Sequence, residues 1–285
     1  MRVDILGVQV DAITREHALN KIKEFLSSNK TNIVTTTYSE FIVAAQKDEK
    51  FKNILNNADL NLADGIGILW AASFLNLHGS SLRGGERSET TKQSQSRLLR
   101  SLWSLAMTVG QFLQTAYYTA FNQEKIKDII PEQIAGADLI FDICNLAQHS
   151  GASVFLLGGH GPINEVLKQK YPNLKIAGRY EGNPDEQGIV DKINQSGADI
   201  LLVAFGPIKQ EYWLWNNKET LRVKLAVGLG GTFDYVLGMR QRAGAFWQRH
   251  GLEWLYRLIT QPWRARRMWN AIVVFSWLIL KNRIK

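Results

Sequence analysis

An acidic residue at the end of a strand is the first feature of this sequence that suggests chemistry. The stretch 58–70, ADLNLADGIGILW, is typical of a short buried strand over 59–62, a glycine turn, and a helix that begins at Ile66. Open α/β sheets bind ligands at the carboxyl ends of their strands, where Asp64 would lie. Its carboxylate there would serve as a general base for a substrate hydroxyl. The alternative is a helix N-cap, a position that Asp often occupies without any catalytic role.

A glycine turn gives a second candidate site. Gly158, Gly159 and Gly161 separate the apolar strand 152–157 (ASVFLL) from a predicted helix over 162–171. A strand, a glycine turn and a helix N-terminus together are typical of a phosphate-binding loop. Neither the Walker sequence nor G-x-G-x-x-G is present, so the turn alone also fits an ordinary strand–helix connection.

Turn residues follow five predicted strands, and this convergence indicates a site more strongly than any single motif. The five strands end at Thr36, Leu62, Leu157, Phe205 and Leu229. In a parallel sheet all these ends lie on one edge.

The elements that must position these residues alternate between strand and helix. Such alternation predicts an α/β fold, a Rossmann-like and mostly parallel sheet with helices on both faces. Near-continuous apolar strands such as 199–205, DILLVAF, are typical of a sheet that is buried on both sides. We expect an α/β domain over 1–240 with a helical insertion at about 77–127, and a helical, membrane-associating appendage over 241–285.

The insertion interrupts the alternation. A polar, glycine-containing loop precedes the run from Ser101 to Gln123, which contains no charged residue. Its length would suffice to cross a bilayer, but its large apolar residues favour one helical face. We predict an amphipathic segment that lies in the membrane interface. A transmembrane helix and a helix packed on the domain are the alternatives.

Basic charge is concentrated in the C-terminal tail. The whole chain carries +8, whereas from Arg240 onward ten positive residues and one acid, Glu253, give +9. Five of the nine Trp residues also lie in this tail. Arginine combined with tryptophan suits a membrane interface or a phosphate-bearing ligand. No nucleic-acid-binding module accompanies the charge, so nucleic acid is not expected as a partner.

The tail is predicted to be helical over 247–267, with a break near Pro262. Its arginines would form either the solvated side of a docking helix or a cover that closes over an anionic ligand. The final apolar run, 271–280, is too short to span a bilayer and would suit a tail that lies on one.

Cysteine usage and the N-terminus exclude other classes. The single cysteine, Cys144, cannot form a disulfide framework or a thiolate metal site, and we expect it to be buried. The first apolar run contains charges and lacks a small-residue cleavage site, so we do not expect a secretory signal.

Six motifs, taken together and in this order, resemble the WecG/TagA/CpsF glycosyltransferases (glycosyltransferase family 26). They are ADLNLADGIG, EQIAGADL, VFLLGG, ILLVAFGPIKQEYW, VGLGGTFDYVLG and GLEWLYRLITQPWRARR. The resemblance covers the chain except about 77–127. It implies an inverting transferase that takes a sugar, N-acetylmannosamine or another hexose, from a UDP-sugar donor. The implied acceptor is a polyprenyl-diphosphate-linked saccharide of cell-wall, teichoic-acid or exopolysaccharide synthesis.

The same resemblance implies where and how the protein works. It implies no metal or other cofactor, and a peripheral protein at the cytoplasmic face of the cell membrane. It leaves the donor sugar and the oligomeric state open, a homo-oligomer included.

The resemblance also assigns roles to residues. It implies that Asp64 is the base, with Thr36 at a strand end beside it. The residues implied on the nucleotide side are Gly158, Gly159, Gln210, Gly231 and Asp234. The arginines suited to the acceptor diphosphate are Arg257, Arg264 and Arg267.

Two residues depart from the family pattern. Tyr38 stands where the family usually has Asn, and Gln133 stands where it usually has Arg. Without that Arg, either the tail supplies the charge or activity is weakened. The alternative function is therefore a catalytically weak or silent nucleotide-sugar-binding protein at the membrane surface. The α/β pattern would also suit a nicotinamide-dependent oxidoreductase, but the glycine fingerprint and its ribose-binding acid are missing.

Overall fold

Three stretches of the chain are described by the computed structural model: residues 1–76, 95–241 and 243–284. At 95–105 and at Ala245 the description is limited to the backbone. The polar loop predicted at the start of the insertion lies outside the described residues up to residue 94.

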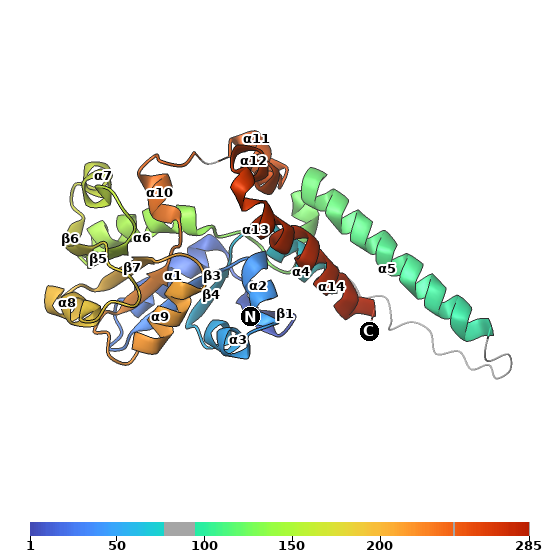
Figure 1. Cartoon of the computed structure of the whole chain (residues 1–285), viewed down its shortest axis with the longest axis horizontal. Coiled ribbons are helices and arrows are strands. Elements are labelled where there is room, and N and C mark those ends of the chain that lie inside the picture. The colour runs from blue at the N-terminus through green and yellow to red at the C-terminus, as the bar shows by residue number, and fades with distance from the viewer. Residues whose placement is uncertain (77–94, 242, 285) are drawn as a thin grey trace.

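The described residues form one eight-stranded sheet with the order β1-β2-β4-β3-β8-β7-β5-β6 (Figure 1). The strands are β1 (Arg2–Ile5), β2 (Val8–Asp11), β3 (Asn32–Thr37), β4 (Leu60–Ala63), β5 (Ser153–Gly158), β6 (Lys175–Tyr180), β7 (Ile200–Ala204) and β8 (Leu225–Gly228). β1 and β2 form an antiparallel hairpin, and every other neighbouring pair is parallel. The mostly parallel α/β sheet predicted from the sequence is confirmed.

Helices connect the strands and extend the chain at its end. The helices before the insertion are α1 (Arg15–Phe25), α2 (Ser39–Ala45), α3 (Glu49–Asn56) and α4 (Ile66–Asn76). The next are α5 (Gln95–Phe121), η1 (Gln123–Ile126), α6 (Gly136–Ser150), α7 (Ile163–Lys170), α8 (Ile189–Ser196), α9 (Lys209–Asn217) and α10 (Thr232–Val236). The tail holds α11 (Ala245–Arg249), α12 (Glu253–Thr260), η2 (Pro262–Arg264), α13 (Ala265–Trp269), η3 (Asn270–Val274) and α14 (Phe275–Ile284).

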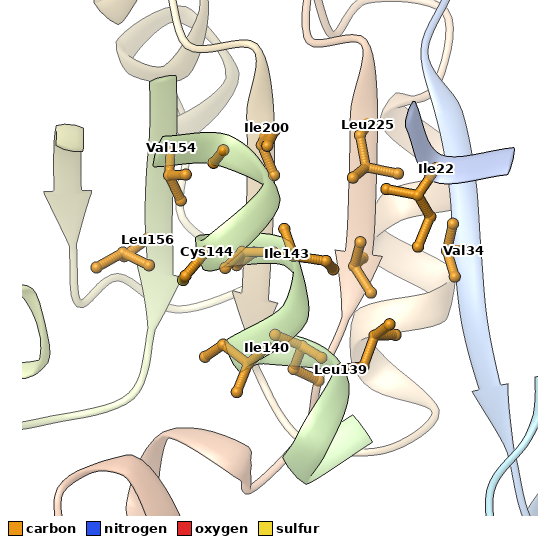
Figure 2. Packing of buried hydrophobic residues seen from close by; sticks show 14 of the residues in the cluster. Ile22, Val34, Leu139, Ile140, Ile143, Cys144, Val154, Leu156, Ile200 and Leu225 are labelled. Atoms are coloured by element: carbon orange, nitrogen blue, oxygen red, sulfur yellow. The ribbon is translucent and has the colours of Figure 1, made fainter. Parts of the chain in front are cut away.

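Both faces of the sheet are covered, because successive strand residues point to opposite sides. Leu156 of β5 packs in one core with α1 and α6, whereas its neighbour Leu157 packs in another core with α8 and α9. Figure 2 shows the first core, in which one side of α6 packs over the sheet. Cys144 is buried there, as the sequence predicted.

A third core joins the hairpin, α2, α3 and α4 to the end of the chain. In α14, Phe275 and Ile279 are fully buried in this core. The sequence suggested that the run 271–280 lies on a bilayer. The face that carries these two residues is covered by protein, whereas Trp277 in the same run is 59% exposed, so contact of this run with a bilayer stays a prediction.

The helix of the insertion, α5, lies against α4 and α14 and extends beyond them (Figure 1). Trp70 Nε1 of α4 donates a hydrogen bond to Thr115 Oγ1 at 3.1 Å, and Arg283 of α14 donates one to Gln111 Oε1 at 2.6 Å. This part of α5 therefore matches the alternative of a helix packed on the domain. Across the described stretches, no helix combines the length and apolar character needed to cross a bilayer. Membrane contact by the insertion stays a prediction.

The tail is divided more finely than predicted. The predicted break near Pro262 is present, since α12 ends at Thr260 and η2 begins at Pro262, but residues 245–284 as a whole form several short helices that change direction between them. One change falls at Gly251, whose φ is +64°. These turns allow the tail to pass over the carboxyl edge of the sheet and then return to pack on α2 and α4.

The strand order locates the ligand-binding edge. β3 and β8 are neighbours in the middle of the sheet, with β4 beyond β3 and β7 beyond β8. The chain runs outward from β3 to β4 on one side and returns through β7 to β8 on the other. Such a point of reversal leaves a crevice at the carboxyl ends of the strands, where α/β proteins bind ligands.

Candidate active site

A cavity of about 740 Å³ occupies this crevice, and residues of the tail line part of it. Its floor comes from the ends of β3, β4 and β8, its walls from α4, α5 and α6, and its cover from residues of α11 to α14. Four of the five predicted strand ends contribute lining residues, represented by Thr36, Asp64, Pro207 and Leu229. The end of β5 does not.

Asp64 lies on the floor of the cavity, in the turn after β4. The backbone N–H of Asp64 donates to Thr37 O at 2.8 Å, and the next residue, Gly65, has a φ of +100°, which favours glycine. Asp64 Oδ2 accepts a hydrogen bond at 3.2 Å from the backbone N–H of Gly136, the first residue of α6. The positive end of this fifteen-residue helix therefore stabilises the negative charge of the carboxylate.

Gly136 lies beside three side chains of the floor that carry oxygen atoms. A Cβ atom at this position would lie 3.4 Å from Thr36 Oγ1, 3.6 Å from Thr232 Oγ1 and 3.7 Å from Asp64 Oδ2. The structure thus brings together the hydroxyl and the carboxylate that the resemblance paired. The third hydroxyl, on Thr232, was not singled out in the sequence.

Four arginines line the cavity from the side of the tail: Arg240, Arg257, Arg264 and Arg267. We call them the arginine group. Arg257 pairs with Glu253 at 2.5 Å, Arg267 with Glu40 at 2.8 Å, and Arg240 with Asp234 at 3.0 Å. Within the described residues, Arg264 is the member without a carboxylate partner.

The environment of Arg264 is unfavourable for a cation. Burial, and then repulsion from the guanidinium groups of Arg240 and Arg267, lowers the pKa of Arg264 below its ordinary value. A bound anion would relieve both effects, because it replaces lost hydration and offsets the repulsion. This arrangement is suited to phosphate oxygens, which guanidinium groups bind in pairs.

Gln210 lies in the wall with its amide already oriented by the protein. Its Oε1 accepts from the Gly230 N–H at 2.7 Å, and its Nε2 donates to Glu211 Oε1 at 2.7 Å. An amide nitrogen carries two hydrogens. Within the described residues, the second hydrogen has no acceptor, so a ligand would find a donor there.

Glu211 is a residue whose importance the sequence analysis missed. It is completely buried, and its Oε2 accepts a hydrogen bond at 2.7 Å from the backbone N–H of Ile208, which has a φ of +70°. Burial raises the pKa of Glu211 to about 7. The sequence feature that could have identified Glu211 is its place directly after Gln210, in a predicted helix that follows a buried strand. Glu211 thereby holds both the strained turn and the amide of Gln210.

The residues predicted on the nucleotide side separate into two places. Gly231 lines the cavity, and Asp234 stands at its rim through its ion pair with Arg240. Gly158 and Gly159 do not line the cavity. They allow close packing instead, since a Cβ would lie 2.9 Å from Ala204 O at the first and 2.7 Å from the Phe233 ring at the second.

Both departures from the family pattern lie in the cavity wall. Gln133 and Tyr38 are lining residues. The Tyr38 hydroxyl donates to Glu40 Oε2 at 3.1 Å and accepts from Arg267 at 3.2 Å, and burial raises the pKa of Tyr38. Tyr38 therefore helps to orient Arg267. Gln133 is neutral, but the arginine group brings positive charge to the same cavity.

In the described part of the chain, no group of three or more His, Cys, Asp or Glu side chains is arranged to hold a metal ion.

Comparison with known proteins adds two relatives. An N-acetylglucosaminyldiphosphoundecaprenol N-acetyl-beta-D-mannosaminyltransferase of Bacillus spizizenii is 28% identical over 249 residues, which is 86% of this chain and 77% of the relative. A protein of the same name from Staphylococcus aureus is 24% identical over 292 residues, covering 100% of this chain and 94% of the relative.

A family comparison covers nearly all of the sequence. The family described as "Glycosyl transferase WecG/TagA/CpsF family" matches residues 3–87 and 105–285. Apart from residues 1 and 2, the unmatched residues are 88–104, which fall inside the predicted insertion, so the match extends further than the six motifs indicated. The chain belongs to the WecG/TagA/CpsF family of glycosyl transferases.

Proposed function

We propose that this protein is an inverting glycosyltransferase. It moves an N-acetylmannosamine-type sugar or another hexose from a UDP-sugar to a polyprenyl-diphosphate-linked saccharide. The observation that carries the proposal is a single cavity that Asp64, Thr36 and the arginine group all line. The names of the two relatives, which specify a diphosphoundecaprenol-linked acceptor, support the class of acceptor.

The reaction needs one base and stabilisation of one leaving group. Asp64 takes the proton of the acceptor hydroxyl, and the hydroxyl oxygen attacks the anomeric carbon from the face opposite UDP. The bond between the anomeric carbon and the UDP oxygen breaks, its electron pair leaves with UDP, and the configuration inverts. Thr36 hydrogen-bonds the attacking hydroxyl or the sugar beside Asp64.

Binding roles follow from position in the cavity. Gln210 and Gly231 contact the donor, with Asp234 acting at the rim and Gly158 and Gly159 shaping the adjoining strand end. Arg257, Arg264 and Arg267 hold the acceptor diphosphate. Guanidinium groups and backbone N–H groups stabilise the charge of the departing diphosphate without a metal ion.

The lipid acceptor places the protein at a membrane surface, and we propose peripheral association with the cytoplasmic face of the cell membrane. Three tail tryptophans support this location because their side chains are largely exposed: Trp263 (77%), Trp269 (61%) and Trp277 (59%). Tryptophan side chains favour the interface between lipid and water.

An assay of UDP release and sugar transfer tests the proposal. UDP-N-acetylmannosamine is offered with a short-chain prenyl-diphosphate-linked N-acetylglucosamine, with and without EDTA. We expect transfer by the unmodified protein in both conditions, an inverted linkage, and loss of transfer in Asp64→Asn. Binding of UDP without any transfer from a panel of UDP-sugars would instead favour the silent binding protein that Gln133 raises as the alternative.

A further inference from the structure

One group of residues in the cavity lining is apolar and contains no member of the arginine group. Its six residues, which we call the apolar arm, are Ile66, Trp70, Phe112, Ala116, Ala120 and Phe275. They come from α4, α5 and α14, so the insertion helix supplies half of them. The catalytic steps proposed above use none of these side chains.

We propose that the apolar arm binds the first isoprene units of the acceptor lipid, an inference that rests on the proposed function. The diphosphate of such a lipid lies between a sugar and a branched hydrocarbon chain. A cavity with cationic residues on one side and the apolar arm on another matches both parts. An isoprenoid has no hydrogen-bonding groups, so apolar surface alone provides its binding energy.

The helical spacing of α5 shapes the arm. Phe112, Ala116 and Ala120 are four residues apart and therefore lie on one face of the helix. Phe112 forms the end of the arm, with its ring edge-on to Trp70 at 5.3 Å between centroids. The two alanines leave open the space that larger side chains would fill.

The arm is held in place before any ligand binds. The hydrogen bonds from Trp70 to Thr115 and from Arg283 to Gln111 fix α5 against α4 and α14. A further bond, from Gln123 Nε2 to Gln248 O at 3.4 Å, joins the end of the insertion to the cover. Binding therefore does not have to order this wall, which lowers its entropic cost.

The neighbouring face of α5 offers the chain a route outward. Leu113, Tyr117 and Phe121 each follow a residue of the arm and are 62%, 58% and 70% exposed. Apolar surface thus continues from the arm to the outside of the helix. The remaining isoprene units would follow this surface into the bilayer.

Two isoprenoid diphosphates with the same head group test the arm without relying on catalysis. Isothermal titration calorimetry on the full chain compares farnesyl diphosphate with isopentenyl diphosphate at micromolar concentrations. We expect farnesyl diphosphate to bind at least about 30-fold more tightly, since two further isoprene units leave water. Ala116→Phe, which fills the arm, should reduce this preference to about threefold or less.

Ala106→Phe is the matched control, because Ala106 is exposed on the same helix and lies outside the cavity. It should retain the full preference for the longer chain. Ala120→Phe gives a second variant that fills the arm at another point.

The outcomes separate this inference from the proposed function. Equal affinity for the two compounds, or a preference that both arm variants retain, overturns the inference even if the protein transfers sugar. A chain-length preference that the arm variants remove supports an isoprenoid site even if no UDP-sugar is turned over.

Discussion

Replacement of Arg264 by Gln tests whether the arginine group binds an anion. Burial and the charges of Arg240 and Arg267 lower the pKa of Arg264 in the folded protein. A base with a lowered pKa is less stable as a cation in the folded state than in the unfolded state. The charge therefore reduces stability at every pH below that lowered pKa. Arg264→Gln removes this penalty, so the free energy of unfolding should stay constant or rise by up to about 1 kcal/mol.

The same substitution should weaken binding of a diphosphate. A hydrogen bond to a charged group contributes about 1.5–3 kcal/mol, and about 1.4 kcal/mol corresponds to a factor of ten in affinity. The Kd for isopentenyl diphosphate should therefore rise roughly 12- to 140-fold. Stability and affinity are thus expected to change in opposite directions.

Calorimetric titration gives the Kd, and urea unfolding at pH 7 gives the free energy of unfolding. Arg266→Gln is the control, since it removes the same charge from an exposed residue that does not line the cavity. Its Kd should remain within about twofold of the original, because exposed charges are screened by salt.

Two results would refute the reasoning about Arg264. A loss of stability with an unchanged Kd would make it a structural residue. Weaker binding of UDP with unchanged binding of isopentenyl diphosphate would move it from the acceptor side to the donor side.

Three further substitutions probe the floor and walls of the cavity. Asp64→Asn should lower transfer by about 100- to 10,000-fold, because the general base is lost. The midpoint of thermal unfolding of this variant should change little, since Asn retains an acceptor for the Gly136 N–H. Near-normal release of UDP by the variant would remove Asp64 from the mechanism. Folding raises the pKa of Glu211 from 4.5 to about 7, so the folded state binds the extra proton and stability falls as pH rises through this window. The difference of about 2.5 units corresponds to about 3 kcal/mol between pH 4 and pH 8. In urea titrations, the free energy of unfolding of Glu211→Gln should depend less on pH than that of the unmodified protein. An identical pH dependence in the two proteins would contradict the argument that burial raises the pKa of Glu211. The Gln133→Arg variant should bind UDP about tenfold more tightly, because the arginine adds a charge-assisted hydrogen bond. An unchanged calorimetric Kd for UDP would mean that residue 133 does not face the diphosphate of UDP.

Local sequence patterns predicted most elements because their signals lie within a few residues. The helix after Asp64 was expected to begin at Ile66, and α4 begins at that residue. The boundaries of α7 were less accurate: a helix was predicted over 162–171, but it runs from Ile163 to Lys170. A local preference does not determine which of several permitted residues starts a helix.

The sequence alone determined the fold class, the strand ends that form the site, and the candidate base at Asp64. Each follows from hydrophobic periodicity and from the rule that parallel strands share one carboxyl edge. Tertiary structure decided which side chains meet in the cavity and which do not. Arg267 pairs with Glu40 across 227 positions of sequence, and α5 supplies an apolar wall to a site built elsewhere. Gly158 and Gly159, whose motif suggested phosphate binding, pack against β7 and α10 instead. Periodicity encodes the direction in which a residue points within its own element, whereas these contacts depend on how distant elements pack, which no local pattern specifies.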